Sequence, residues 1–266
     1  MNFFQYVLCF FIYAFLGYVC EVIYCSIGQR KLVNRGYLYG PICPIYGYGA
    51  ILVIFVMTPI KNLGTWYFPL VFLAGTVLVT VLEYLTSYVM EKLFHMRWWD
   101  YSRYKFQING RVCLLNSTLF GILIMVVMYL IQPFIEKFIL ANVNNTALYS
   151  LDGVLFAAMV VDTIFSTIKN INISNVIVKL NELEEKASVK LNEIKDGASE
   201  KISEIKTEAS EKISETKEKL TLKLKEFSRK YPNINIRKIG KGRKTVKEII
   251  DSNLNEDLKD ENKWIL

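Results

Sequence analysis

Long apolar segments separated by short polar ones fill the first 168 residues of the chain. A helix needs about 20 apolar residues to cross the hydrocarbon core of a bilayer, which is about 30 Å thick. Five segments approach or reach that length: residues 3–27, 42–60, 66–92, 114–138 and 150–168. The pattern predicts an all-α fold, a polytopic membrane helical bundle of about five transmembrane helices, with residues 1–168 as the transmembrane domain.

The pattern changes after residue 168. Residues 174–229 contain no proline and are rich in helix formers. Their apolar positions follow a 4, 4, 3 spacing within an eleven-residue repeat, about 3.67 residues per turn, which favours a straight or slightly right-handed contact stripe. A long charged amphipathic helix is predicted for residues 169–231. Three alternatives stand for it: a coiled coil that forms a homo-oligomer through residues 180–227, a helix along the inner leaflet, or a solvated spacer.

Charge divides the chain at the same place. Residues 1–168 hold 10 Lys and Arg and 7 Asp and Glu, whereas residues 169–266 hold 22 and 18. A soluble domain of the first composition would have too little charge to cover its surface. The five cysteines form no C-x-x-C pair and His95 is the single histidine, so we expect no metal site, no disulfide and no cofactor.

Basic residues predict the orientation, because Lys and Arg concentrate in cytoplasmic loops. They follow the first, third and fifth apolar segments, whereas the other connections offer only Lys61 and Lys137. This predicts an outer N-terminus and a cytoplasmic C-terminus in a bacterial inner (plasma) membrane.

Residues 228–247 hold eight basic residues and no acidic one, which favours binding to anionic lipid of the inner leaflet. Nucleic acid is not expected. The final segment, 232–266, is a basic and then acidic tail.

Ionisable residues within membrane spans are costly and usually have a partner or a function. Glu21, Glu83 and Asp162 lie at similar depths in the predicted cytoplasmic halves of three spans. The Gly/Pro-rich stretch 36–47 begins the second segment at that depth, and non-helical backbone there must be buried in protein or face water. We infer a polar pocket open to the cytosol. Its predicted residues are Glu21, Arg35, Gly36, Gly40, Pro41, Pro44, Tyr46, Glu83, Asp100, Asn109, Arg111 and Asp162.

Two readings of this pocket stay open. In the first, the carboxylates pair with Arg35 and Arg111 and only fix helix packing. In the second, they bind a ligand or an ion. Asp100 lies among aromatic residues (Trp98, Trp99 and Tyr101) that suit membrane-interface anchors, although it could also bind a cation or pair with an arginine. No catalytic residue is predicted, because no nucleophile–base pair is evident.

Four blocks carry a family resemblance: Asn34–Gly47, Leu82–Tyr84, Arg97–Ser102 and Asn109–Cys113. Residues 3–140 resemble the bacterial family of putative ABC-transporter permeases (type IV, CmpB-like). The resemblance implies a transport subunit. Any ATPase would be a separate subunit, because residues 240–245 lack the glycine spacing of a phosphate-binding loop and are interpreted as a basic loop. The first hypothesis is a transporter permease-like component with a cytosol-facing polar site. A membrane scaffold and a membrane-embedded enzyme are the alternatives, the enzyme being less favoured.

Overall fold

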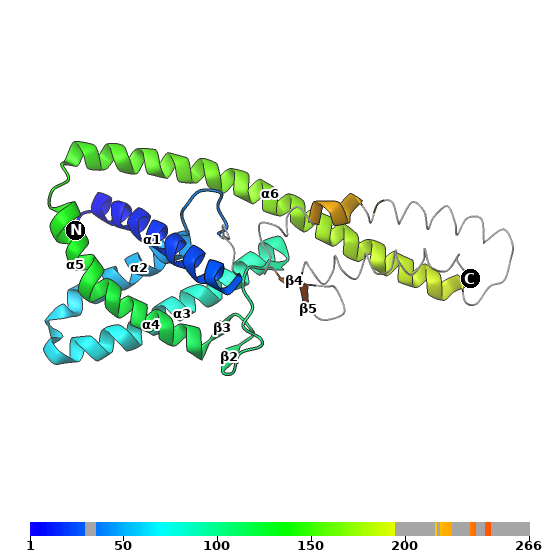
Figure 1. Cartoon of the computed structure of the whole chain (residues 1–266), viewed down its shortest axis with the longest axis horizontal. Coiled ribbons are helices and arrows are strands. Elements are labelled where there is room, and N and C mark those ends of the chain that lie inside the picture. The colour runs from blue at the N-terminus through cyan, green and yellow to red at the C-terminus, as the bar shows by residue number, and fades with distance from the viewer. Residues whose placement is uncertain (30–35, 195–215, 217–218, 225–234, 238–242, 246–266) are drawn as a thin grey trace. The chain divides into compact units, whose positions relative to one another are not determined.

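The computed structural model describes residues 1–29, 36–194, 216, 219–224, 235–237 and 243–245. The chain divides into two compact units, and Figure 1 labels the helices and strands in them. The first unit comprises Met1–Val89 and Asp100–Thr167, and the second comprises Met90–Trp99 and Ile168–Leu266. Each unit is described by itself.

Helices form almost all of the first unit. In chain order they are α1 (Phe3–Gln29), α2 (Pro44–Met57), the 3-10 segment η1 (Thr58–Trp66), α3 (Tyr67–Phe94), α4 (Leu114–Val126), η2 (Val127–Ile131), α5 (Gln132–Ile135), η3 (Glu136–Leu140) and the beginning of α6 (Asn145–Ile194). Pro44 is the first residue of α2, where its fixed φ suits a helix start. Gly64 has φ 60° and ψ −131°, which interrupts the helical backbone before α3.

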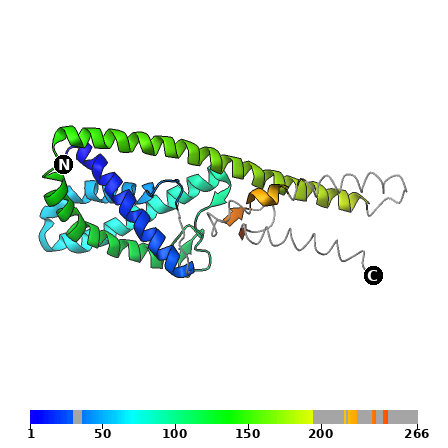
Figure 2. The ribbon, with the colours of Figure 1, turned by 45° about the horizontal axis from the view of Figure 1, so that its top comes forward.

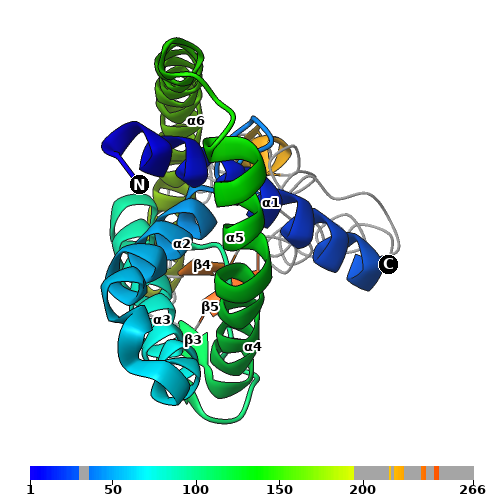
Figure 3. The same ribbon diagram turned by 90° about the vertical axis from the view of Figure 1, so that its left-hand side faces the viewer.

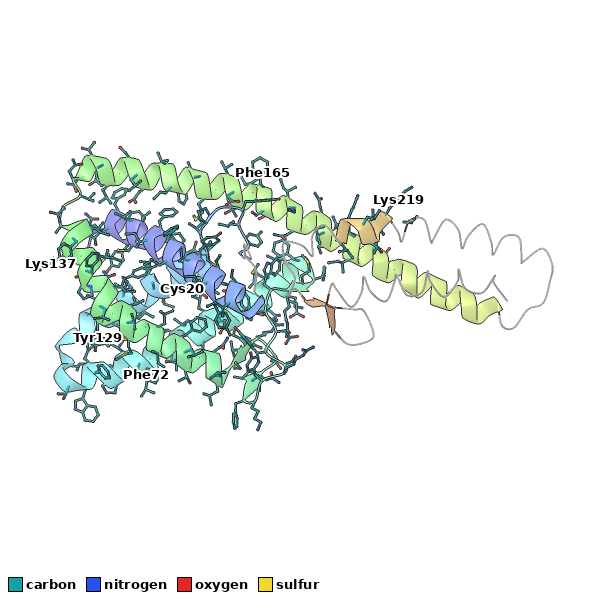
Figure 4. All side chains as sticks on the ribbon, in the orientation of Figure 1. Cys20, Phe72, Tyr129, Lys137, Phe165 and Lys219 are labelled. Atoms are coloured by element: carbon teal, nitrogen blue, oxygen red, sulfur yellow. The ribbon has the colours of Figure 1, made fainter. Side chains whose placement is uncertain are left out.

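Four of the described helical segments are long and apolar enough to cross a membrane: Phe3–Ile27, Leu63–Phe94, Leu114–Leu140 and Asn145–Lys179. The prediction of an all-α membrane bundle is therefore confirmed. The second predicted segment is a shorter apolar helix, Pro44–Ile60. Large apolar side chains face outward, among them Trp66 (77% exposed) and Phe165 (63%, labelled in Figure 4). Such a surface suits lipid rather than water.

Glycines allow the helices of this unit to approach closely. A Cβ atom on Gly17 of α1 would overlap Tyr46 of α2, and one on Gly47 would lie 2.7 Å from Phe10. Gly121 of α4 lies against Phe72 of α3 in the same way, and Figure 3 shows these two helices next to each other. These helix pairs are therefore packed backbone to side chain, as small residues permit in membranes.

The segment between α4 and α6 departs from regular α-helix. Two π-helical stretches, η2 and η3, flank α5, which has Pro133 in its first turn. Proline lacks a backbone N–H and cannot continue the regular helical ladder. The chain then turns at residues 141–144, and the side chain of Asn144 accepts a hydrogen bond from the Ala147 amide (2.7 Å) as α6 begins. The rings of Phe4 and Tyr149, 4.3 Å apart, place the start of α6 beside α1 (Figures 1 and 2).

A short hairpin separates α3 from α4. Its strands are β2 (Gln107–Ile108) and β3 (Val112–Cys113), paired antiparallel. Asn109 and Gly110 have φ of 52° and 66°, the positive values that an Asn-Gly hairpin turn requires. This turn was not predicted, although the Asn-Gly dipeptide is its characteristic signal.

The second unit contains the last residues of α3 (from Met90), the continuation of α6 and a small sheet. α6 extends without interruption to Ile194. β1 (Met96–Arg97) pairs with β4 (Asn235–Arg237), which pairs with β5 (Arg243–Thr245). The strand at 243–245 corrects the interpretation of those residues as loop. Most residues of the eleven-residue repeat lie outside the described residues. The same is true of most residues of the predicted 180–227 stripe and of the basic patch at 228–247.

Candidate functional site

Glu83 of α3 is a deeply buried carboxylate with one oxygen satisfied. It is 5% exposed, and its Oε1 accepts a hydrogen bond from the Tyr101 hydroxyl (3.0 Å). Its Oε2 has no hydrogen-bond partner among the described residues. The hairpin segment positions Tyr101, whose amide donates to the Gly110 carbonyl (2.8 Å). Burial, followed by the charge of Glu83, raises the pKa of the Tyr101 phenol, so the phenol keeps its proton at neutral pH and donates this hydrogen bond.

Glu21 of α1 lies near Glu83. The two carboxylates are close enough for their charges to interact, and the Cys43 thiol donates a 3.5 Å hydrogen bond to Glu21 Oε2. Tyr46, in the first turn of α2, interacts electrostatically with Glu21, Cys43, Glu83 and Tyr101. We call these five residues the carboxylate cluster: Glu21, Cys43, Tyr46, Glu83 and Tyr101. It joins α1, α2, α3 and the segment before α4.

Asp162 of α6 accepts hydrogen bonds from backbone amides of the Gly/Pro-rich loop. Its Oδ1 and Oδ2 accept hydrogen bonds from the amides of Tyr39 (2.9 Å) and Gly40 (2.7 Å). The Ser166 hydroxyl donates to Oδ1 (3.1 Å) from the next turn of α6. A Cβ on Gly40 would lie 3.0 Å from Asp162 Oδ2, so glycine allows this approach. Asp162 therefore attaches the Gly/Pro-rich loop to α6.

The same loop has further attachments. The hydroxyls of Tyr37 and Thr167 are 2.6 Å apart, and the Cys43 amide donates to the Ala14 carbonyl of α1 (2.9 Å). Gly36 adopts φ 155°, a conformation that residues with a side chain rarely occupy. Leu38 is buried, whereas Pro41 is exposed. The loop thus joins α6 and α1 to the start of α2.

Arg111 packs on α3. Its guanidinium lies over the rings of Tyr84 and Tyr88, 5.7 and 5.3 Å from their centroids, and its Nη1 donates to Ser87 Oγ (3.3 Å). The Asn109 amide group donates to the Tyr84 hydroxyl (3.0 Å). These contacts fix the hairpin to the helix that carries Glu83, in part through cation–π attraction.

The predicted residues thus fall into three groups. Glu21, Tyr46 and Glu83 come together in the carboxylate cluster, Gly40 and Asp162 form the loop attachment, and Asn109 and Arg111 hold the hairpin to α3. Asp100 accepts a hydrogen bond from the Ser102 amide (2.9 Å). Arg35 lies outside the described residues, and the pocket itself stays a prediction.

Sequence reasoning missed two members of the carboxylate cluster. The cysteines were expected only to form no disulfide and no metal site, and Tyr101 was predicted to be one of a group of interfacial aromatics. Cys43 and Tyr101 both occur in the sequence blocks that carry the resemblance, but nothing in their spacing indicates which carboxylate each contacts. Chemically, the cluster offers two acidic groups and two phenols, which suits a solute that carries positive charge or hydrogen-bond donors.

Comparison with known proteins gives one match, to a family model. No curated protein and no solved structure matches the chain. The sequence model described as "Putative ABC-transporter type IV" matches residues 8–167, which include every described residue of the carboxylate cluster and of the loop attachment. This chain therefore belongs to the family described as "Putative ABC-transporter type IV".

Proposed function

We propose that this chain is the membrane-spanning permease component of a transport complex, and that the carboxylate cluster contacts the transported solute from the cytosolic side. Family membership supports a transport role. The observation that carries the cluster's role is the buried Glu83 carboxylate, whose Oε2 lacks a hydrogen-bond partner among the described residues. Buried polar atoms are normally satisfied, and an exception inside a membrane span calls for a functional explanation.

The chemistry of the cluster favours a particular class of solute. Glu21 and Glu83 are like charges that interact with each other. A positively charged solute would offset this repulsion and satisfy Oε2 at the same time. The substrate proposed is therefore a small solute with a cationic or hydrogen-bond-donating group.

The energy source would be a separate ATPase subunit. The family description names an ABC transporter, and the sequence has no phosphate-binding loop with the required glycine spacing. In this proposal the exposed basic residues of the hairpin segment, Arg103 and Lys105, face the cytosol. The plasma membrane is the proposed location, with the C-terminal region cytoplasmic and its 228–247 patch near anionic lipid.

Purification of the full chain from its native membranes in mild detergent tests the proposal. We expect an ATPase subunit to copurify with vanadate-sensitive ATP hydrolysis. Glu83→Gln should retain the ATPase subunit but alter ATP turnover severalfold, because it removes the proposed solute contact and preserves the side-chain shape. Glu182→Gln, at an exposed position of α6, is the matched control and should behave as the unmodified chain.

The two parts of the proposal fail separately. Absence of any ATPase subunit would reject the permease role. Copurification with ATP turnover that is unchanged in Glu83→Gln would reject the role of the cluster.

A scaffold is the second candidate, favoured by the length of α6. This 50-residue helix continues beyond the membrane-spanning window, which ends at Lys179. In a scaffold the extension would recruit partners or form the homo-oligomer. Deletion of residues 180–266, which removes this extension, discriminates, because a scaffold would lose its partners whereas a permease would keep the ATPase subunit.

A further inference from the structure

A short helical segment, residues 219–224, lies beyond the part of the chain that the family model matches, which ends at residue 167. One face of this segment is buried. Leu220 is 9% exposed and Leu224 is 0% exposed, whereas Leu222 is 57% exposed. Residues four apart share a face of a helix, so the face with Leu220 and Leu224 packs against protein. Figures 1 and 2 both show the segment, in orange, beside α6.

α6 also has a buried face in the second unit. Asn170 (1% exposed), Ser174 (4%) and Ile177 (2%) are buried, and their spacing of four and three residues places them on one face of the helix. Two of these side chains are polar and would be costly to expose to lipid. The compact unit that begins again at Ile168 includes both this face and residues 219–224. The two buried faces therefore belong to the same packed unit.

A second contact, between strands, reaches the end of α3. β1 follows α3 directly and pairs antiparallel with β4, with Met96 opposite Ile236 and Arg97 opposite Asn235. β4 is the central strand of this sheet and pairs with β5 on its other side. Residues from the C-terminal part of the chain thus supply two of the three strands.

A buried ion pair fixes β1 to α3. Arg97 Nε donates to Glu91 Oε2 (2.8 Å), and the two side chains are only 2% and 7% exposed. His95, between them, has φ 53° and donates its amide to the Glu91 carbonyl (3.0 Å), a left-handed turn that is common at helix C-termini. A buried ion pair is costly to separate. A restraint on β1 is therefore passed to the end of α3.

We infer that residues 219–224 and the strands β4 and β5 form an intramolecular strap, which restrains the ends of α3 and α6 in the second unit. α3 carries Glu83 and α6 carries Asp162. The strap therefore acts on the two helices that carry the carboxylate cluster and the loop attachment. Transport requires packed elements to move against one another, so the strap slows the transport cycle. This slowing rests on the proposed function, whereas the restraint itself does not.

Hydrogen exchange of the full chain in detergent, followed by mass spectrometry, tests the restraint. Leu224→Asp places a charge at a fully buried position and should release the segment. Leu222→Asp makes the same change at an exposed position of the same segment and is the matched control. We expect backbone amides of residues 90–99 and 168–179 to exchange severalfold faster in Leu224→Asp, because local opening is less costly without the strap. The control should exchange like the unmodified chain.

Ile236→Pro provides a second variant if Leu224→Asp does not fold. Proline removes a ladder hydrogen bond from the central strand, so the amides of residues 90–99 should again exchange faster than in the control.

The effect on transport has its own measurement. Where an ATPase subunit copurifies, Leu224→Asp should raise ATP turnover severalfold over Leu222→Asp. The inference is overturned if both strap variants exchange like the control, or if exchange accelerates while ATP turnover stays the same. If no ATPase subunit copurifies, the proposed permease role fails, and the exchange rates alone decide whether the strap restrains the helix ends.

Discussion

Glu83 illustrates at the scale of one residue how a carboxylate can be held inside the bundle. The Tyr101 hydroxyl satisfies Oε1, and Oε2 has no partner among the described residues. If one partner of a buried hydrogen bond is removed, the other group stays buried without a partner, and the protein is destabilised by the full desolvation cost of that group. The Tyr101 hydrogen bond should therefore matter more than an average surface hydrogen bond.

Tyr101→Phe removes this hydroxyl and little else. We expect the free energy of unfolding to fall by about 1–3 kcal/mol, the cost of leaving a buried partner unsatisfied. Thermal or denaturant unfolding in detergent, followed by tryptophan fluorescence, measures the change. In a Glu83→Gln background the loss should be smaller, because the charge that the hydroxyl stabilises is gone; an equal loss in both backgrounds would mean that the bond to Glu83 does not contribute.

At the level of secondary-structure elements, close contacts between α1 and α2 determine how these two helices pack. Gly17 faces the part of the Tyr46 side chain nearest its backbone, so the two helices approach within the space that a methyl group would need. The Tyr46 ring cannot avoid an added Cβ by rotation of its distal end. Tyr46 is also a member of the carboxylate cluster, so this packing affects the site.

Gly17→Ala should therefore force α1 and α2 apart. We expect a loss of about 1–3 kcal/mol in the free energy of unfolding, the usual cost of overpacking, measured as a lower unfolding temperature. Gly153→Ala is the matched control, because it also lies in a helix but has nothing within 4 Å of an added Cβ. Its stability should be unchanged or slightly higher; an equal loss for both variants would contradict the packing argument.

The Gly/Pro-rich loop depends on contacts from a distant element. Asp162 accepts hydrogen bonds from two successive amides of the loop, 123 and 122 residues away in sequence. Non-helical backbone at membrane depth must find such partners, since lipid offers none. These contacts make Asp162 an attachment point for the loop backbone, and its place in a pocket stays a prediction.

For the whole molecule, the orientation of the chain in the membrane follows from which connecting segments lie on the same side of the bilayer. The segment between α3 and α4 and the turn before α6 lie at opposite ends of the 27-residue segment Leu114–Leu140, about 40 Å at 1.5 Å per residue. The first of these carries Arg103, Lys105 and Arg111. The excess of basic residues favours the cytosol for that end.

Cysteine labelling of intact cells tests this orientation. Ala141→Cys should react with a membrane-impermeant maleimide from outside, whereas Phe106→Cys should react only after permeabilisation. Both positions are exposed, so a difference reports sidedness rather than burial. The unmodified chain, with its exposed Cys20, measures the background, and labelling of Phe106→Cys in intact cells would reverse the proposed topology.

Contacts between distant parts of the chain also explain why one group of polar residues was not predicted. Gln132, Glu136 and Asp152 lie within predicted apolar segments, and the two carboxylates were as visible there as Glu83. The prediction concentrated on carboxylates near the Gly/Pro-rich stretch, so the hydrogen bonds of Gln132 with Tyr13 and Glu136 were not predicted. The Tyr13–Gln132 hydrogen bond joins residues 119 positions apart, which no local pattern encodes.

Sequence alone determined the helical segments of this protein, because apolar runs of spanning length have few other stable structures in a bilayer. It also indicated that carboxylates and a Gly/Pro-rich loop occur at one depth, since helical rise converts residue number into height. The tertiary structure decided which groups meet: Tyr101 with Glu83, Cys43 with Glu21, and Asp162 with the loop amides. Those choices depend on how whole helices pack and rotate against one another, and that packing is set by close contacts such as Gly17 with Tyr46.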